Sequence, residues 1–205
     1  MTGNLTIKSN FILQRIIGLT GGIASGKSTV ARYLQERHGL LVFDADLYAR
    51  EAVVWGSPIL EQIIDRYGAE ILGEKQLDRR RLGEIIFRDP AEKQWLEQQI
   101  HPFVRQRFER DIAQHPTQDM VLVVPLLIEA QMTDLVNQVW VVTCTQEQQL
   151  ARLVSRDQLS PAAAQGRIDS QMPLAQKIPL AEVVLDNTGD RAELLTQIDR
   201  AMNYQ

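Results

Sequence analysis

Residues 21–29 carry the strongest chemical signal in this sequence. They read Gly-Gly-Ile-Ala-Ser-Gly-Lys-Ser-Thr and fill every fixed position of the pattern G-x-x-x-x-G-K-[ST]. The apolar run 15–20 precedes them and a helical pattern follows from Val30, so the glycine loop lies between a strand and a helix. Backbone N–H groups in such a loop can surround a phosphate at the positive end of the helix. A glycine-rich turn without a ligand is the alternative, and the complete motif in this context argues against it.

The loop predicts a bound nucleoside triphosphate and gives two of its residues specific roles. Lys27 can reach the β- and γ-phosphates, and the hydroxyl of Ser28 can ligate Mg²⁺. The glycines allow the backbone to approach a phosphate that a Cβ would keep away. The residues expected to contact the nucleotide are Gly22, Ile23, Ala24, Ser25, Gly26, Lys27, Ser28 and Thr29.

Two carboxylates, Asp44 and Asp46, follow the second apolar run. Ligands of an open parallel sheet bind beyond the carboxyl ends of its strands, so we expect both residues beside the phosphate loop. Phosphoryl transfer to an alcohol needs a carboxylate near the attacking hydroxyl, and Mg²⁺ takes acidic oxygens or waters held by them. One aspartate could instead cap the helix that begins near Leu47. Capping does not explain both.

The third apolar run, Met120–Val124, lacks the terminal aspartate that often ends the corresponding strand of phosphate-loop GTPases and ATPases. It continues Pro-Leu-Leu-Ile-Glu over residues 125–129. This absence argues against a motor or switch protein and favours a small kinase, in which Ser28, substrate phosphates and water hold the metal. Glu129 could lie near an acceptor pocket or be an ordinary surface residue.

Cations and a histidine complete the set of candidates. Arg152 and Arg156 lie four apart on a predicted helix over 146–157, and a transferring phosphoryl group calls for such cations. Solvated helix charges are the alternative. Arg81, in the string Asp-Arg-Arg-Arg at 78–81, could meet an anionic substrate or belong to a solvated helix start. His101 precedes a proline, which predicts an extended backbone at a helix boundary. It could contact the acceptor or fasten a helical segment through a buried hydrogen bond.

Five apolar segments alternate with helical patterns, which predicts an α/β fold with a mostly parallel five-stranded sheet covered by helices on both faces. The predicted strands are 15–20, 41–44, 120–124, 138–144 and 182–187. The stretch between the second and third strands is too long for a loop, so we expect an inserted helical segment over 56–117. Helix starts are expected at Ser57-Pro58 and Asp89-Pro90. A shorter excursion at 159–179, with a helix start at Ser160, suits a lid.

Composition excludes several classes of protein. The 205 residues carry 22 basic and 26 acidic side chains, a net charge of −4, so nothing attracts the whole chain to nucleic acid or an anionic membrane. No stretch reaches the roughly eighteen apolar residues of a membrane span. The single cysteine, Cys144, excludes an internal disulfide and favours a reducing compartment, by default the cytoplasm. Its apolar surroundings favour a core residue over a nucleophile. Residues 1–14 are expected to form a frayed extension without a signal-peptide cleavage site.

The chain resembles the dephospho-CoA kinase family over most of its length, from about 15 to 202. The resemblance rests on the phosphate loop, Asp-Ala-Asp at 44–46, His-Pro at 101–102 and Pro-Leu-Leu at 125–127, in this order and spacing. Further matches are Leu77-Asp78-Arg79, Phe87, Glu129, Gln149-Leu150-Ala151-Arg152, Arg156, Ser170-Gln171 and Asp186-Asn187. Ala24 departs from the family, which usually has glycine there. Its methyl group is harmless if φ is negative and costs about 1 kcal/mol or more otherwise.

This resemblance implies a reaction, a layout and a set of residue roles. The reaction would be ATP-dependent phosphorylation of the ribose 3′-hydroxyl of 3′-dephospho-CoA, with Mg²⁺, giving CoA and ADP. The layout would be a three-layer P-loop kinase domain with a core at 15–55, 118–158 and 180–205, a substrate-binding insertion at 56–117 and a lid at 159–179. Asp46 would be the base, and Arg152 would stabilise the charge on the transferring phosphoryl group. Lys27 would be the third catalytic residue, and Ser28 would hold the metal. The expected acceptor-binding residues are Asp44, Asp46, Arg81, His101, Leu126 and Glu129. A monomer is expected.

Two rival functions remain open at this point. A kinase for another small alcohol, such as a nucleoside or a sugar acid, would need a different inserted segment. A nucleotide-dependent switch or binding module would need no acceptor at all. The sequence lacks the guanine-reading Asn-Lys-x-Asp string of GTP switches, which argues against the second rival.

Overall fold

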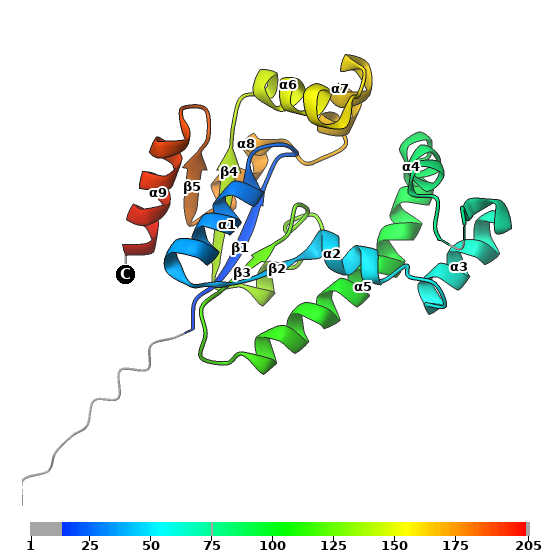
Figure 1. Ribbon diagram of the computed structural model, residues 1–205, viewed down its shortest axis with the longest axis horizontal. Helices are drawn as coiled ribbons and strands as arrows, with labels where there is room; N and C mark the ends of the chain where they lie inside the picture. Colours follow the sequence, from blue (N-terminus) through cyan, green and yellow to red (C-terminus); the bar gives the residue numbers. More distant parts are fainter. Residues whose placement is uncertain (1–13, 75, 204–205) are drawn as a thin grey trace, which may run out of the picture.

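The computed structural model describes residues 14–74 and 76–203 and shows an α/β domain in three layers (Figure 1). The predicted extension at 1–14 lies, apart from Gln14, outside the described residues. The central sheet has five strands, which are β1 (Ile16–Gly21), β2 (Leu41–Asp44), β3 (Met120–Val123), β4 (Gln138–Thr143) and β5 (Val183–Asp186). All four strand pairings are parallel, in the order β2-β3-β1-β4-β5. The predicted fold class is confirmed, and each strand lies within one residue of its expected bounds.

The strand order places the phosphate loop near the middle of the sheet. β1 is the central strand, so residues 21–29 emerge at its carboxyl end between the ends of β3 and β4. Asp44 ends β2 one strand further away. The carboxyl ends of parallel strands meet at one sheet edge, and this edge therefore collects the candidate site residues.

Each face of the sheet has its own apolar core. Helices α1 (Lys27–His38) and α9 (Arg191–Asn203) cover one face, where Leu34 and Ile198 pack against Trp140 and are fully buried. Helices α2 (Ala45–Glu51) and α5 (Pro90–Gln114) contribute to the other, where Phe108 is fully buried beside Leu122. Cys144 is buried, as expected of a core residue.

Between β2 and β3 the chain forms α2 and then α3 (Pro58–Tyr67), η1 (Ala69–Ile71), α4 (Arg79–Arg88) and α5. Helices α3 and α4 project to one side of the sheet with the first part of α5 (Figure 1). They bury a separate apolar cluster that includes Leu60 and Ile63. The expected helix starts are confirmed, since Ser57 and Asp89 are N-caps and a proline opens each helix. That the segment 56–117 binds the acceptor stays a prediction.

After β4 come α6 (Gln146–Asp157), α7 (Pro161–Asp169), α8 (Leu174–Lys177) and η3 (Ile178–Leu180). Ser160 caps α7, as its sequence predicted. Helices α6 and α7 lie above the carboxyl edge of the sheet (Figure 1). Whether 159–179 moves as a lid stays a prediction. A short 3-10 helix, η2 (Thr133–Leu135), precedes β4.

The expectation for His101 is wrong. His101 and Pro102 lie inside α5 rather than at a helix boundary. A proline within a helix removes one backbone hydrogen bond and disfavours the helical state of the residue before it. Here the packing of Leu96, Val104 and Phe108, all buried, keeps the helix continuous across it. No helix within the described ranges is long and apolar enough to cross a membrane.

Candidate active site

Several backbone carbonyls of the phosphate loop, residues 21–29, accept hydrogen bonds from side chains. Lys27 Nζ donates to the carbonyl oxygens of Gly21 at 3.1 Å and Gly22 at 2.8 Å. Asn187 Nδ2, from the loop after β5, donates to the carbonyl of Ser25 at 2.7 Å. These carbonyls are thus engaged by protein donors. The N–H groups of Ile23 and Ser25 also have protein acceptors, so an anion would be bound by other N–H groups of the loop.

Helix α6 supplies two more donors to the same loop. Gln149 Nε2 lies 2.8 Å from the carbonyl oxygen of Ile23, and Arg152 Nη1 lies 3.1 Å from that of Ala24. Arg152 Nη2 also donates to the carbonyl of Asn187 at 3.4 Å. The capping box of Thr145 and Gln148 fixes the start of α6, and through it the position of both donors.

Ala24 has φ 57°, in the left-handed region. The condition under which its methyl group would be harmless, a negative φ, is therefore not met in this chain. A residue with a Cβ in this region is strained by about 1–2 kcal/mol, which explains why glycine suits the position. Gly26 at φ 106° meets the same need without strain.

The two aspartates after β2 have different local roles. Asp44 caps α2, because its carboxylate accepts a hydrogen bond from the backbone N–H of Asp46 at 2.8 Å. Burial raises the pKa of Asp44. Asp46 stands in the first turn of α2 without a capping role. The capping alternative thus explains Asp44 and leaves Asp46 available for chemistry.

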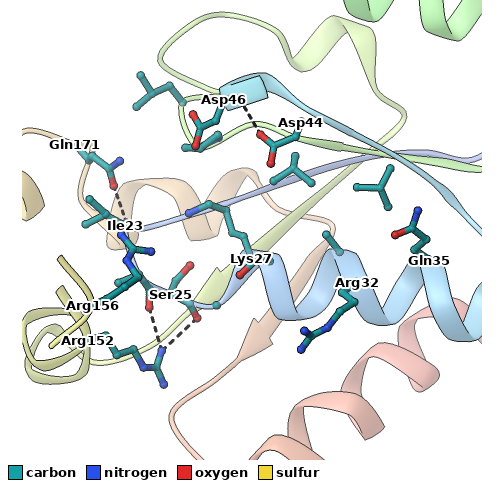
Figure 2. A pocket seen from close by; sticks show the side chains of 18 of the residues that line it. Ile23, Ser25, Lys27, Arg32, Gln35, Asp44, Asp46, Arg152, Arg156 and Gln171 are labelled. Carbon is teal, nitrogen blue, oxygen red and sulfur yellow. Dashed lines mark hydrogen bonds between the residues drawn. The ribbon is translucent and has the colours of Figure 1, made fainter. Parts of the chain in front are cut away.

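A cavity of about 1150 Å³ unites these groups. Its lining includes Lys27, Ser28, Asp44, Asp46 and Arg152. Figure 2 shows Lys27 rising from the loop, with the two aspartates on one side of it and Arg152 with Arg156 on the other. The residues singled out for the reaction therefore meet in one place. Of the expected nucleotide contacts, residues 23–28 line the cavity, whereas Gly22 and Thr29 do not.

Burial and, after it, the positive charge of Lys177 lower the pKa of Lys27 to about 8, whereas Asp46 opposes the change. A buried ammonium with neutral carbonyl partners gains a great deal from an anionic ligand. The electrostatics of the site therefore favour a phosphate group at Lys27.

Three predicted acceptor-binding residues lie outside the lining of this cavity. Arg81 is exposed, and its Nη1 donates to the carbonyl of Glu70 at 2.7 Å. His101 is half-buried in α5, and burial lowers its pKa. Glu129 accepts hydrogen bonds from the backbone N–H of Met172 and from Lys177. Leu126, by contrast, lines the cavity.

Sequence reasoning gave no role to Lys177, Gln149 or Gln171. Lys177 is fully buried and donates to the carbonyl of Pro125 at 3.0 Å as well as to Glu129. Gln171 Oε1, between α7 and α8, accepts from the N–H of Ile23 at 2.7 Å (Figure 2). Both glutamines belong to strings that carry the family resemblance, which was the only signal for them. Nothing in the sequence marked Lys177.

The residues at this site fit a hydrated Mg²⁺ beside bound phosphates. Within residues 14–74 and 76–203, no cluster of three or more His, Cys, Asp or Glu side chains could enclose a metal by itself. Mg²⁺ commonly keeps several waters and uses one or two protein oxygens with substrate phosphates. Ser28 offers such an oxygen on the cavity wall. The buried hydroxyl of Ser25 has no hydrogen-bond partner in the described part of the chain, so a ligand oxygen could supply one.

Comparison with known proteins agrees with this geometry. The CoaE model, described as dephospho-CoA kinase, matches residues 15–193. The dephospho-CoA kinase of Synechococcus elongatus is 57% identical over 195 residues, covering 94% of this chain and 93% of its own length. That of Synechocystis sp. is 55% identical over 194 residues, with coverages of 94% and 96%.

Solved structures show the same fold. The dephospho-CoA kinase from Campylobacter jejuni superposes with a TM-score of 0.66 and 28% identity, covering 91% of this chain and 94% of its own. The protein TT1252 from Thermus thermophilus reaches a TM-score of 0.78 at 33% identity, with coverages of 92% and 96%. A shikimate kinase from Bacteroides thetaiotaomicron, with a TM-score of 0.54 and 12% identity, shares the fold alone. The family match covers most of the chain, and the phosphate loop, the paired aspartates and Arg152 line one cavity. This chain therefore belongs to the dephospho-CoA kinase family.

Proposed function

We propose that Lys27, Asp46 and Arg152 carry the phosphoryl transfer of this chain. Dephospho-CoA kinase transfers the γ-phosphate of ATP to the ribose 3′-hydroxyl of 3′-dephospho-CoA, giving CoA and ADP in the last step of coenzyme A biosynthesis. The observation that carries the residue assignment is that all three side chains line one cavity together with the phosphate loop.

Each residue has a role that its surroundings support. Lys27 can exchange its bonds to the carbonyls of Gly21 and Gly22 for phosphate oxygens, which it reaches from the same loop. Asp46, the carboxylate without a capping role, orients or deprotonates the acceptor hydroxyl. Arg152 neutralises charge that develops on the transferring group. Asp44 supports Asp46 through its hydrogen bond to the Asp46 backbone.

Mg²⁺ belongs to this proposal as a bound cofactor. Ser28 would hold it through Oγ, and Asp44 and Asp46 would reach it through water. When bound, the ion supplies positive charge to the phosphates of ATP. Titration of ATP-dependent activity against Mg²⁺ in Ser28→Ala tests the assignment. We expect the Mg²⁺ concentration for half-maximal rate to rise by about tenfold, the effect of one lost ligand contact. An unchanged titration would exclude Ser28 as a ligand.

Only some of the residues predicted to bind the acceptor line the cavity. Leu126 and Asp44 line the cavity and are retained as contacts of the ribose end of the acceptor. Arg81 and His101 lie on the helical insertion outside the cavity wall, where they could meet only the distal part of the acceptor. Glu129 is engaged by Lys177, so we assign it to holding the wall rather than to the acceptor.

One assay tests the proposed function against its rivals. Purified protein is mixed with Mg-ATP and a panel of acceptors that includes 3′-dephospho-CoA, nucleosides and sugar acids, and ADP release is followed. We expect strong stimulation by 3′-dephospho-CoA alone. Stimulation by another alcohol would support a different kinase, and ATP binding without acceptor-dependent turnover would support a binding module.

A matched pair of variants links the assay to the cavity. Lys27→Ala should abolish detectable turnover, because the γ-phosphate loses its cation. Arg37→Ala removes a cation from the exposed far end of the same helix and should leave the rate unchanged. Retained turnover in Lys27→Ala would contradict the proposed pose of ATP.

We further propose that the enzyme works as a monomer in the cytoplasm, without nucleic-acid or membrane partners. The net charge of −4 supports the lack of nucleic-acid and membrane partners, and the single cysteine, Cys144, supports a reducing compartment. Light scattering during size-exclusion chromatography tests the oligomeric state, and cell fractionation tests the location. A dimeric mass, or recovery of the enzyme with membranes, would refute the corresponding part.

A further inference from the structure

Two side chains of α6 hold the peptide groups on either side of Ala24. Gln149 Nε2 donates to the carbonyl of Ile23 at 2.8 Å, which belongs to the peptide group before Ala24. Arg152 Nη1 donates to the carbonyl of Ala24 at 3.1 Å, which belongs to the peptide group after it. The two side chains are three residues apart, so they project from one face of the helix. Together they fix both backbone dihedrals of Ala24.

Ala24 needs this support because its φ of 57° is unfavourable for a residue with a Cβ. A strained conformation persists only where the surrounding structure over-determines it. If the carbonyl of Ile23 were released, the peptide group between Ile23 and Ala24 could rotate and relieve the strain. That rotation would change the direction of the Ala24 N–H and so disturb the set of N–H groups that the loop offers to phosphates.

The packing around Gln149 shows that the contact is built into the loop. Gln149 is 5% exposed, so its amide needs a protein partner. A Cβ placed on Gly22 would overlap Nε2 of Gln149. Gly22 does not line the cavity itself. The absence of a side chain at Gly22 therefore leaves the space that the Gln149 amide occupies.

We propose that Gln149 is a positioning residue for nucleotide binding. It holds the Ile23–Ala24 peptide group in the orientation that the phosphate loop requires, and Gly22 makes room for its amide. Gln149 acts through the loop and touches none of the reacting atoms. The inference rests on the proposed nucleotide site, so binding of Mg-ADP to the wild-type protein is measured first. No binding there would contradict the proposed function itself.

The first test is the dissociation constant for Mg-ADP, measured by isothermal titration calorimetry. Gln149→Met keeps the length of the side chain and removes its donor. We expect the constant to rise by about tenfold, the effect of one buried hydrogen bond. The KM for 3′-dephospho-CoA should stay within about twofold, because only the nucleotide loop is disturbed. Gln146→Met makes the same change at an exposed position of α6 and should leave the dissociation constant unchanged.

A second variant, Ala24→Gly, distinguishes a positioning role of Gln149 from a general loss of structure. Glycine adopts a left-handed conformation without strain, so Ala24→Gly removes the reason for the support. In the Ala24→Gly background, Gln149→Met should raise the dissociation constant by less than about threefold relative to Ala24→Gly alone, because the two effects are coupled. Gly22→Ala, which displaces the Gln149 amide, should weaken binding as Gln149→Met does, and the two changes should not add.

Two results would overturn the inference. One is a wild-type dissociation constant in Gln149→Met, and the other is a tenfold loss that persists undiminished after Ala24→Gly. If Gln149→Met alone fails to fold, the Ala24→Gly double variant decides. A double variant that folds and binds Mg-ADP supports the positioning role, and one that neither folds nor binds refutes it.

Discussion

The ammonium of Lys177 lies 2.8 Å from Oε1 of Glu129 and joins α8 to the loop after β3. Lys177 is fully buried, whereas the side chain of Glu129 keeps 22% exposure. The same carboxylate accepts from the N–H of Met172 at 3.2 Å, so both ends of the segment 172–177 are attached to one residue. This segment is therefore attached to the loop after β3, and if 159–179 moves as a lid, we expect the motion in residues 159–171.

Removing the buried cation should destabilise the fold. Lys177→Met removes the cation beside Glu129 and one of the two donors to the carbonyl of Pro125, which keeps its hydrogen bond from Thr20. Because Glu129 is partly exposed and keeps the N–H of Met172, we expect a cost of about 1–3 kcal/mol. Urea unfolding measures the change in the free energy of unfolding. Lys93→Met removes a partly exposed pair at 3.8 Å with Glu97 and a hydrogen bond to the carbonyl of Ser170, and it should cost less than about 1 kcal/mol.

A double variant tests whether the loss of stability in Lys177→Met comes from the broken pair with Glu129. Adding Glu129→Leu to Lys177→Met removes the unpaired carboxylate, so the double variant should be less destabilised than the sum of its single variants. Additive losses would mean that Lys177 and Glu129 are not coupled and that this pair does not anchor the segment 172–177.

Asp46→Asn tests the assignment of the two aspartates. Asparagine keeps the size of the side chain and removes the basic carboxylate, so kcat should fall by about 10²–10⁴-fold, the range for loss of a general base. Steady-state assays with 3′-dephospho-CoA give kcat and both KM values. Near-normal turnover would remove Asp46 from this role. Asp44→Asn keeps a capping oxygen for the Asp46 backbone and should have a smaller effect on kcat.

The parts of this site that follow from local rules could be predicted from the sequence. The loop between β1 and α1, the caps at Ser57 and Asp89 and the position of Asp44 at the end of β2 depend on neighbouring residues only. Arg152 was found through its place before the second excursion. These features need no knowledge of distant contacts.

Contacts between distant parts of the chain could not be predicted in this way. Gln149 is 126 residues from Ile23 and Gln171 is 148 residues from it, so no spacing rule joins them. Lys177 is 52 residues from Pro125 and looks like any surface lysine in the sequence. The helix boundary predicted at His101 was wrong for a related reason. The tertiary packing of α5 outweighs the local preference that the following proline imposes.

Acid should weaken the contact between α3 and α5. Hydrogen bonds from Arg66 and Tyr67 lower the pKa of Glu92 from 4.5 to about 2. The folded state thus holds the carboxylate charged where the unfolded chain would protonate it. This contribution to stability is fully present above about pH 4.5 and is lost as the pH falls toward 2.

Unfolding free energies measured from pH 6 down to about pH 3 would reveal the effect of Glu92. Glu92→Gln should show a flatter decline over this range than the wild type. Glu61→Gln, an exposed change on α3, serves as the control and should follow the wild-type curve. Parallel curves for Glu92→Gln and the wild type would exclude Glu92 as a source of the acid sensitivity.

The last prediction concerns the contact between the helical insertion and α7. A Cβ built on Gly166 of α7 would lie 2.7 Å from Cζ of Phe87 on α4, so the aromatic ring rests against the glycine. Lys93 Nζ of α5 donates to the carbonyl of Ser170 at 3.1 Å in the same region. If these contacts set the spacing of the two segments around the acceptor, separating them should raise the KM for 3′-dephospho-CoA more than that for ATP.

Gly166→Val removes this contact, because the valine side chain takes the place of the Phe87 ring, which is 59% exposed and must move away. We expect the acceptor KM to rise about fivefold or more, with the KM for ATP changed less than about twofold, because uniform binding of one substrate is lost. Phe87→Ala in the same chain removes the clash and should recover part of the acceptor KM. Equal rises in both KM values, or no recovery with Phe87→Ala, would show that Gly166→Val acts through α7 itself rather than through its contact with the insertion.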